Sequence, residues 1–431
     1  MNSSELTQHL SRLHARRWVG LLATPVATRQ WALGVFLLAL VLRTAYALIA
    51  PHVDPFLVSN PLLGDAASYD RVARTLLSGG AYGEYAERPS VFWPPLFPFL
   101  LTAIYKVFGY NLMAGRVVLA ILGALLPMLA YLAVSKIERQ PIAVLTGVGL
   151  VFYPYLVYFG AWLIAEGLYF ALLGWILWIG VRLQQKPSLG PALLFGLACA
   201  LAILAKPTHL FQLLFLGIWF LCCFVAVRWW RRLALGVFTA AVIVLGLAPW
   251  VYHNYHTFGT LILVSTNGGY TFYGANNADA FGGHYEHFPP GIPDLSEAEE
   301  QAAYYRLGIA WITSNPQAYL ELTGRKLTRL ISPLSVASSP QDFRVPAEPI
   351  FRLLYALFLI ASASGLVLSL RDWRQYYLFY TPILGVFLST VIFYGDTRFT
   401  LPAVPSLVLF ASLGCFRAFE RITNGSTIPD S

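Results

Sequence analysis

The chain has 431 residues, of which 57% are hydrophobic and only 12% are charged, and its mean hydropathy is +0.62. Soluble domains carry about 25% charged residues, so this composition excludes an ordinary soluble protein and indicates one that lies in a bilayer. The net charge of +8 does not indicate a nucleic-acid partner, because the basic residues concentrate in short loops between apolar runs, where they set membrane topology. The four cysteines lie in apolar segments, so we expect neither a disulfide framework nor a zinc site.

Ten apolar runs approach the length of about 20 residues that a helix needs to cross a bilayer core. The shorter run 94–108 is interpreted as a helix that lies in the membrane interface or re-enters the membrane. The sequence therefore predicts an all-α polytopic membrane protein with about ten transmembrane helices, interfacial helices in the first outer loop and one larger outer loop. The ten predicted spans are 31–50, 112–134, 142–159, 161–182, 190–206, 207–227, 233–251, 351–370, 376–394 and 398–417.

The distribution of Lys and Arg predicts the orientation in the membrane. With a cytoplasmic N-terminus, the short inside loops hold most of the basic residues, and the two long loops hold few for their length. We therefore expect a multi-pass protein of the inner (plasma) membrane, with both termini cytoplasmic and its active site periplasmic. The predicted division is an N-terminal transmembrane module 1–251 with the first outer loop 51–111, a large outer loop 252–350, and C-terminal helices and tail 351–431.

The first outer loop carries an acidic residue at the start of an amphipathic segment. Gly64 and Asp65 open a stretch with helical spacing, which Gly79 and Gly80 end. Asp65 has two interpretations, which are compatible. It is a good N-cap residue, and it could also be a carboxylate general base at the membrane surface, where apolar neighbours raise a carboxyl pKa.

Farther along the same loop, Arg88 follows Glu87 and precedes a proline-rich segment. An arginine has the planar geometry to bind a phosphate through two hydrogen bonds. The alternative is an exposed arginine paired with Glu84 or Glu87, and the sequence alone favours that alternative.

Other charged residues are predicted at the same outer level. Glu166 lies about one turn into the fourth predicted span, and an ionisable group in a span indicates function unless it only reaches up to the interface. Lys206 lies at the outer turn between the fifth and sixth spans, and Asp396 and Arg398 lie between the ninth and tenth. Cationic groups around two acids at headgroup depth suit an anionic lipid headgroup, although each alone could be an interfacial anchor.

The large loop begins with glycines interleaved with aromatic residues and two amides, Asn276 and Asn277. Aromatic rings and amides suit sugar recognition, by stacking and by hydrogen bonds to hydroxyl groups. The same composition is also what turns require.

With these residues in view, the chain resembles the C-type polytopic glycosyltransferases, in the branch of the dolichyl-phosphate-mannose–protein mannosyltransferases and the lipid A aminoarabinose transferases. Ala66 stands where many relatives have a second acidic residue, and the chain ends without the additional soluble domain of the aminoarabinose enzymes. The resemblance rests on Gly64-Asp65 with Tyr69, Glu87-Arg88-Pro89 with Pro94-Pro95, Ala165-Glu166-Gly167, the tract from Ala248 to Asn277, and Gly395-Asp396-x-Arg398 before Leu401-Pro402.

The resemblance implies a role for each matching residue. Asp65 would activate the acceptor hydroxyl, Glu166 would assist, and Arg88, Lys206 and Arg398 would hold the donor phosphate. Tyr69, Asn276 and Asn277 complete the expected substrate site. No metal ligand is assigned, no cofactor is certain, and a divalent cation could still assist.

We therefore expect a glycosyltransferase that moves a hexose or pentose from a polyprenyl-phosphate donor, with inversion, to a glycan, lipid or protein acceptor on the periplasmic face. We also expect contact with membrane lipids, and we expect no nucleic-acid partner. The alternatives are a transporter or flippase of a lipid-linked saccharide, which would favour charges near the bilayer midplane and repeated halves, and a non-catalytic assembly subunit.

Overall fold

The computed structural model describes residues 25–62, 64–283, 295–332 and 348–424. These residues form helices and turns, and no β-strand occurs among them apart from one isolated bridge between Tyr85 and Arg88. The prediction of an all-α polytopic fold is confirmed. The long helices are α2 (Pro25–Val53), α6 (Leu112–Val134), α9 (Glu166–Gln185), α12 (Trp229–Phe258), α16 (Glu348–Ser369), α17 (Trp373–Ile392) and α19 (Val404–Asn424).

Six stretches of the described chain are long and apolar enough to cross a membrane. One of them joins α16 and α17 over Pro349–Ile392, which the sequence analysis divides into two spans. Three other predicted spans, 142–159, 190–206 and 207–227, correspond to shorter apolar helices, so the count of ten stays a prediction. The shorter helices are α5 (Leu96–Phe108), α7 (Gln140–Phe152), α8 (Pro154–Tyr158), α10 (Leu189–Ala205) and α11 (Leu210–Cys223).

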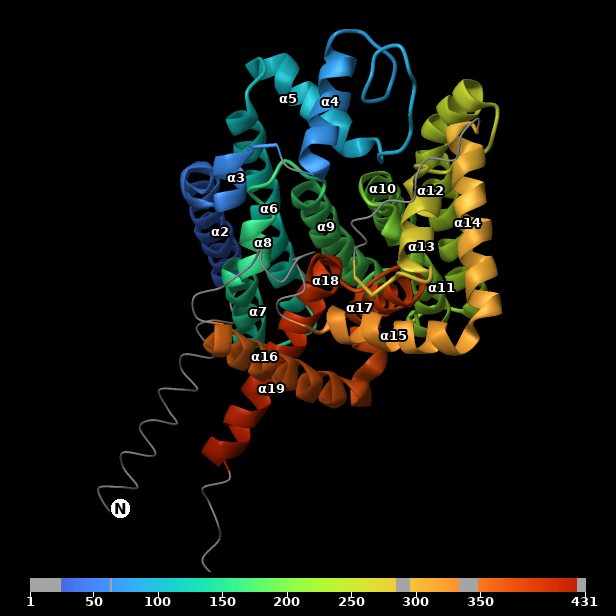
Figure 1. The fold of residues 1–431 in the computed structure, drawn as a ribbon. Helices are drawn as coiled ribbons and strands as arrows, with labels where there is room; N and C mark the ends of the chain where they lie inside the picture. The colour runs from blue at the N-terminus through green and yellow to red at the C-terminus, as the bar shows by residue number, and fades with distance from the viewer. Residues whose placement is uncertain (1–24, 63, 284–294, 333–347, 425–431) are drawn as a thin grey trace, which may run out of the picture.

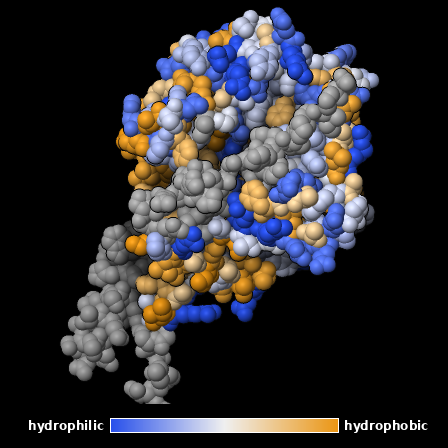
Figure 2. Space-filling view, viewed as in Figure 1, coloured by the Kyte–Doolittle hydropathy of each residue, from blue (hydrophilic) through white to orange (hydrophobic). Residues whose placement is uncertain are grey.

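The outward faces of the long helices are suited to lipid. On α2, Leu33, Leu37 and Val41 are 47–66% exposed, and on α12 Val237 and Leu245 are at least 60% exposed. In Figure 2, hydrophobic residues gather over the flank formed by α2 and over α16, whereas hydrophilic residues gather at the end that carries α4 (Asp65–Leu77). Exposed apolar side chains in continuous rows are stable only against an apolar solvent.

The helix bundle has two distinct ends. At one end, the Arg116 guanidinium near the start of α6 donates to the Pro61 carbonyl, 3.1 Å away. At the other end, Gln185 donates to the Lys136 carbonyl and Gln184 donates to the Arg374 carbonyl. We call these the Asp65 end and the Arg374 end.

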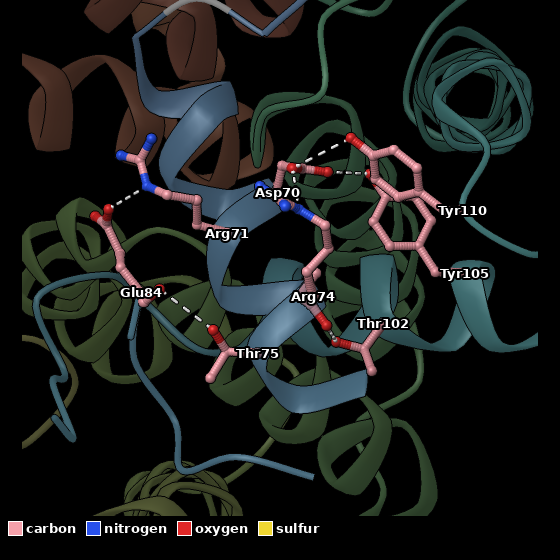
Figure 3. A network of polar contacts seen from close by, with 9 residues as sticks. Asp70, Arg71, Arg74, Thr75, Glu84, Thr102, Tyr105 and Tyr110 are labelled. Carbon is pink, nitrogen blue, oxygen red and sulfur yellow. Dashed lines mark hydrogen bonds and ion pairs between the residues drawn. The ribbon is translucent and has the colours of Figure 1, made fainter. Parts of the chain in front are cut away.

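At the Asp65 end, α4 lies across α5 (Figure 1). The contact is fixed by Asp70, which is fully buried on α4. Its carboxylate accepts hydrogen bonds from the Tyr105 hydroxyl of α5 at 2.7 Å and from Arg74 Nε at 2.8 Å (Figure 3). Because a buried carboxylate is costly unless its oxygens are satisfied, this network fixes the position of α4, and with it Asp65 at the start of the helix.

The described part of the large loop packs against both neighbouring parts of the chain. The Glu297 carboxylate accepts hydrogen bonds from the Val91 amide, 3.0 Å away, and from the Thr266 hydroxyl. Gly395 donates its amide hydrogen to the Gly282 carbonyl at 3.0 Å. The loop thus joins the segment after α4 to the turn before α18 (Thr397–Thr400). Its helices are α13 (Asn267–Ala275), α14 (Glu297–Ser314) and α15 (Pro316–Leu330).

The predicted domain boundaries fall inside helices. The boundary at 251/252 lies within α12, which continues to Phe258, and the boundary at 350/351 lies within α16.

Candidate active site

Two acidic residues each begin a helix at the Asp65 end. Asp65 is the first residue of α4, after Gly64, and Glu166 is the first residue of α9, after Ala165. The positive end of a helix dipole stabilises a carboxylate in this place. Gly64 has φ +58° and ψ −129°, a conformation that glycine alone adopts at low cost. The structure corrects two sequence interpretations: Gly64, not Asp65, is the N-cap, and Glu166 starts its helix rather than lying one turn inside it.

Arg398 joins the two acids. Its Nη1 lies 2.7 Å from Asp65 Oδ2, and its Nε lies 2.5 Å from Glu166 Oε1. The guanidinium presents donors in a fixed planar arrangement, so one side chain can bind two carboxylates at once. Residues 65, 166 and 398 are far apart in sequence, and the structure brings all three together.

Lys206 completes the cluster from the turn after α10. Its Nζ lies 2.8 Å from Glu166 Oε1, so Glu166 receives both cations on the same oxygen. The Lys206 ammonium also lies 5.4 Å from the centre of the Phe399 ring. We call Asp65, Glu166, Lys206 and Arg398 the acid–base cluster, which brings together four of the eight predicted site residues.

Access differs sharply between the two acids. The Asp65 side chain is 34% exposed, whereas that of Glu166 is 1% exposed. An incoming hydroxyl group can therefore reach Asp65 directly, and Glu166 can act only on groups that enter the interior. Glu166 Oε2 is buried and has no hydrogen-bond partner among the described residues. A buried acceptor of this kind carries a desolvation cost that a donor from a bound substrate would remove.

Tyr69 lies about one helical turn after Asp65 and is buried. Its ring packs at 5.0 Å from the rings of both Trp93 and Phe97. Burial raises the pKa of Tyr69 well above its ordinary value, and the nearby charges of Asp65 and Glu166 raise it further. The hydroxyl therefore stays protonated beside the cluster, and the prediction of Tyr69 as a substrate contact stays a prediction.

Asp396 supports the segment that carries Arg398. Its Oδ1 accepts a hydrogen bond from the Arg398 amide at 2.9 Å and caps α18. Burial raises the pKa of the Asp396 carboxyl to about 6, although the cations Arg398, Arg329 and Lys206 act in the opposite direction.

Arg88 lies apart from this cluster. It is exposed in the loop after α4, and no side-chain contact joins it to the cluster within the described chain. The alternative pairing with Glu84 is not formed either, because Glu84 binds Arg71 at 2.6 Å and Trp93 Nε1 at 2.8 Å. Binding of a donor phosphate by Arg88 stays a prediction.

The two predicted amide residues contact the protein itself. Asn276 donates to the carbonyls of Phe272 and Ile392 and accepts from Lys326 Nζ at 2.7 Å. Asn277 donates to the Tyr273 carbonyl and accepts from the Asp279 amide. These contacts give both residues a structural role, and their predicted contact with sugar stays a prediction.

The sequence analysis missed Lys326, which is fully buried on α15. Burial lowers the pKa of its ammonium to about 7. Lys326 lies on a charged amphipathic helix, and in the sequence such a helix reads as solvent-exposed. The burial of Lys326 becomes visible only from the contacts of its ammonium with Asn276 and the Tyr319 ring.

A divalent cation does not fit between the two acids in this structure. The Arg398 guanidinium lies between Asp65 and Glu166, and Lys206 adds a second positive charge. Within the described ranges, no group of three His, Cys, Asp or Glu residues could hold a metal ion.

Residues 93–253 match the family described as dolichyl-phosphate-mannose-protein mannosyltransferase. No curated protein sequence matches the chain.

Two solved oligosaccharyltransferase structures share its fold. The archaeal oligosaccharyltransferase AglB from Archaeoglobus fulgidus, in complex with an inhibitory peptide and a dolichol-phosphate, has a TM-score of 0.50 at 13% identity, over 94% of this chain and 52% of that chain. The same organism's oligosaccharyltransferase tethered with an acceptor peptide has a TM-score of 0.54 at 12% identity, over 93% and 51%. ArnT from Cupriavidus metallidurans bound to undecaprenyl phosphate has a TM-score of 0.42 at 16% identity, over 94% and 81%.

The chain therefore spans about half the length of the oligosaccharyltransferases that it matches. At these identities the likeness is one of fold alone. Over residues 93–253 the chain is similar to the family described as dolichyl-phosphate-mannose-protein mannosyltransferase, and over most of its length its fold is similar to that of the oligosaccharyltransferases.

Proposed function

We propose that this protein is a membrane glycosyltransferase that moves a sugar from a polyprenyl-phosphate donor to an acceptor hydroxyl group on the extracytoplasmic face, with inversion. One observation carries the proposal: a partly exposed acid, Asp65, shares an arginine with a buried acid, Glu166, which also binds a lysine. The family matched by residues 93–253 supports a lipid-phosphate donor.

The exposure of the two acids assigns their roles. Asp65 takes the proton as the acceptor O–H bond breaks, and the acceptor oxygen forms a bond to the anomeric carbon of the sugar. The bond between that carbon and the phosphate oxygen breaks, and its electron pair leaves with the polyprenyl phosphate. Because one displacement occurs, the anomeric configuration inverts. Glu166 stays ionised, orients Arg398 and Lys206, and accepts a hydrogen bond from a substrate hydroxyl through Oε2.

The cations stabilise the leaving phosphate. Lys206 and Arg398 supply positive charge beside the two acids, where negative charge develops on the departing oxygen, and electrostatic stabilisation of this kind is usually the largest catalytic contribution. Arg88, exposed in the first outer loop, would reach the donor phosphate only when substrate is bound. The donor lipid lies alongside the apolar helices, which places its headgroup at the level of the cluster.

The decisive experiment is Asp65→Asn in purified protein given a labelled polyprenyl-phosphate sugar. We expect transfer to fall by about 10²–10⁴-fold, the usual contribution of a general base. Glu87→Gln is the matched control, because Glu87 is an exposed acid of the same loop. Transfer by Asp65→Asn at the wild-type rate, with a normal protein level, would refute the role of Asp65.

The same assay distinguishes a glycosyltransferase from the alternative functions. Detergent-solubilised protein has no bilayer across which to move a lipid, so cleavage of the donor in detergent distinguishes a transferase from a transporter or flippase. A non-catalytic subunit would leave the donor intact in both detergent and bilayer.

A further inference from the structure

A second polar site lies at the Arg374 end, away from the acid–base cluster. A cavity of about 810 Å³ opens there between the end of α16, the start of α17 and the last turns of α19. The volume lies within the roughly 300–1,000 Å³ of typical ligand sites. Nothing in the proposed transfer reaction uses this cavity. It is lined by Leu368, Arg371, Asp372, Tyr376, Leu413, Arg417, Glu420 and Arg421.

The lining of the cavity contains arginines that form no ion pair within the described part of the chain. Glu420 is already neutralised, because it binds Arg417 at 3.0 Å and Arg139 at 2.6 Å. No acidic side chain of the described residues pairs with Arg371 or Arg421. The lining holds three arginines (Arg371, Arg417 and Arg421) and two acids (Asp372 and Glu420), a net charge of +1, so the cavity favours an anion.

The surroundings of the cavity are apolar as well as basic. Leu368 and Leu413 belong to its lining, and Leu370 and Phe419 beside it are 53% and 64% exposed. An exposed phenylalanine and leucine next to unpaired arginines suit a molecule with a charged head and apolar chains.

We propose that this cavity binds the headgroup of an anionic phospholipid from the leaflet opposite the acid–base cluster. The phosphate lies between Arg371 and Arg421, and the acyl chains lie along Leu370 and Phe419. Basic pockets between transmembrane helices bind anionic headgroups in this way. The proposal is independent of the proposed transfer activity, since it requires no residue of the acid–base cluster.

The test compares two double variants that remove the same charge from the same end of the molecule. Arg371→Gln/Arg421→Gln changes the cavity, and Lys136→Gln/Lys186→Gln changes exposed lysines that do not line it. Each protein is purified, exchanged into bilayer discs containing equal phosphatidylglycerol and phosphatidylcholine, and analysed by native mass spectrometry for retained lipid. All four substituted residues are exposed or line an open cavity, and size-exclusion elution verifies folding.

We expect wild type and the lysine variant to retain phosphatidylglycerol in preference to phosphatidylcholine, and the arginine variant to lose at least tenfold of that preference. Equal retention by the two double variants would overturn the proposal. A parallel thermal-unfolding series with soluble glycerol phosphate distinguishes the sources of phosphate. If glycerol phosphate stabilises wild type as much as phosphatidylglycerol does, the ligand is a free phosphate and the lipid proposal is wrong.

Discussion

At the scale of single residues, the candidate site depends on the shape of one side chain. Arg398 reaches Asp65 with Nη1 and Glu166 with Nε. A lysine would keep the positive charge but has no planar pair of donors, so it could satisfy only one acid well.

We predict that Arg398→Lys lowers transfer by about ten- to a hundredfold, because one charge-assisted hydrogen bond contributes roughly 1.5–3 kcal/mol. The measurement is the rate of sugar transfer from a labelled lipid donor. Arg228→Lys is the control for a general preference for arginine, since Arg228 is exposed, lies outside the cluster and has no assigned role in transfer. Wild-type transfer by Arg398→Lys would mean that charge alone is needed.

Asp396 gives the site a dependence on pH. Burial raises the pKa of this carboxyl from 3.8 to about 6, so the folded protein binds more protons than the unfolded chain between these values. The free energy of unfolding therefore falls as pH rises through this window, by up to roughly 3 kcal/mol.

We predict that Asp396→Asn raises thermal stability at pH 7 and that the advantage disappears as pH falls toward 4. Asparagine retains the capping oxygen but cannot ionise, so only the charge is tested. The measurement is thermal unfolding of both proteins in detergent across the pH series. A stability difference that does not change with pH would contradict this assignment.

At the scale of elements, a buried arginine accompanies a break between two helices. α7 ends at Phe152 and α8 begins at Pro154, which has no N–H group to donate to the Leu150 carbonyl. Arg43 of α2 donates its Nη2 to that carbonyl at 3.2 Å and is only 2% exposed. The arginine replaces the hydrogen bond that the proline removes.

Because the Arg43 side chain donates to the carbonyl that Pro154 cannot reach, we predict that mutations at these two residues have non-additive effects on stability. Tyr153 is extended in the wild type (ψ 115°), and we expect α7 to extend through residue 154 in the Pro154→Ala protein, so that the new N–H bonds the Leu150 carbonyl. Arg43→Met should then destabilise the wild-type protein by about 1.5–3 kcal/mol more than it destabilises the Pro154→Ala protein. Unfolding of the four proteins of this double-mutant cycle in bicelles measures the difference. Additive effects would show that the contact has no energetic role.

The helices and the acid–base cluster were predictable to different degrees. Apolar runs indicated the long helices, because hydropathy is a local property of the sequence. Charged residues at the ends of the predicted spans indicated that Asp65, Lys206 and Arg398 lie at the same depth in the membrane. The sequence could not indicate that α9 begins at Glu166, because the turn before it is as apolar as the helix. Contacts such as Lys326 with Asn276 depend on packing between segments 50 residues apart, and no local pattern encodes them.

At the scale of the whole molecule, the large loop connects the parts that carry the site. It contacts the segment after α4 through Glu297 and Val91, and it contacts the turn before Arg398 through Gly282 and Gly395. Gly395 also lies directly on α15, where a Cβ atom would come within 1.8 Å of the Lys326 carbonyl oxygen. This close approach positions the segment that ends in Arg398.

We predict that Gly395→Ala lowers transfer by at least about tenfold, because α15 or the turn must move and a shift of 1 Å at a catalytic group can cost about a hundredfold. Gly324→Ala is the matched control on α15, since nothing lies within 4 Å of its added Cβ. In a helix interior that change should stabilise by roughly 0.5–1 kcal/mol and leave transfer unchanged. Both variants are compared by transfer rate and by thermal unfolding. Full transfer by Gly395→Ala would mean that Arg398 keeps its place without α15, and that the large loop does not position the site.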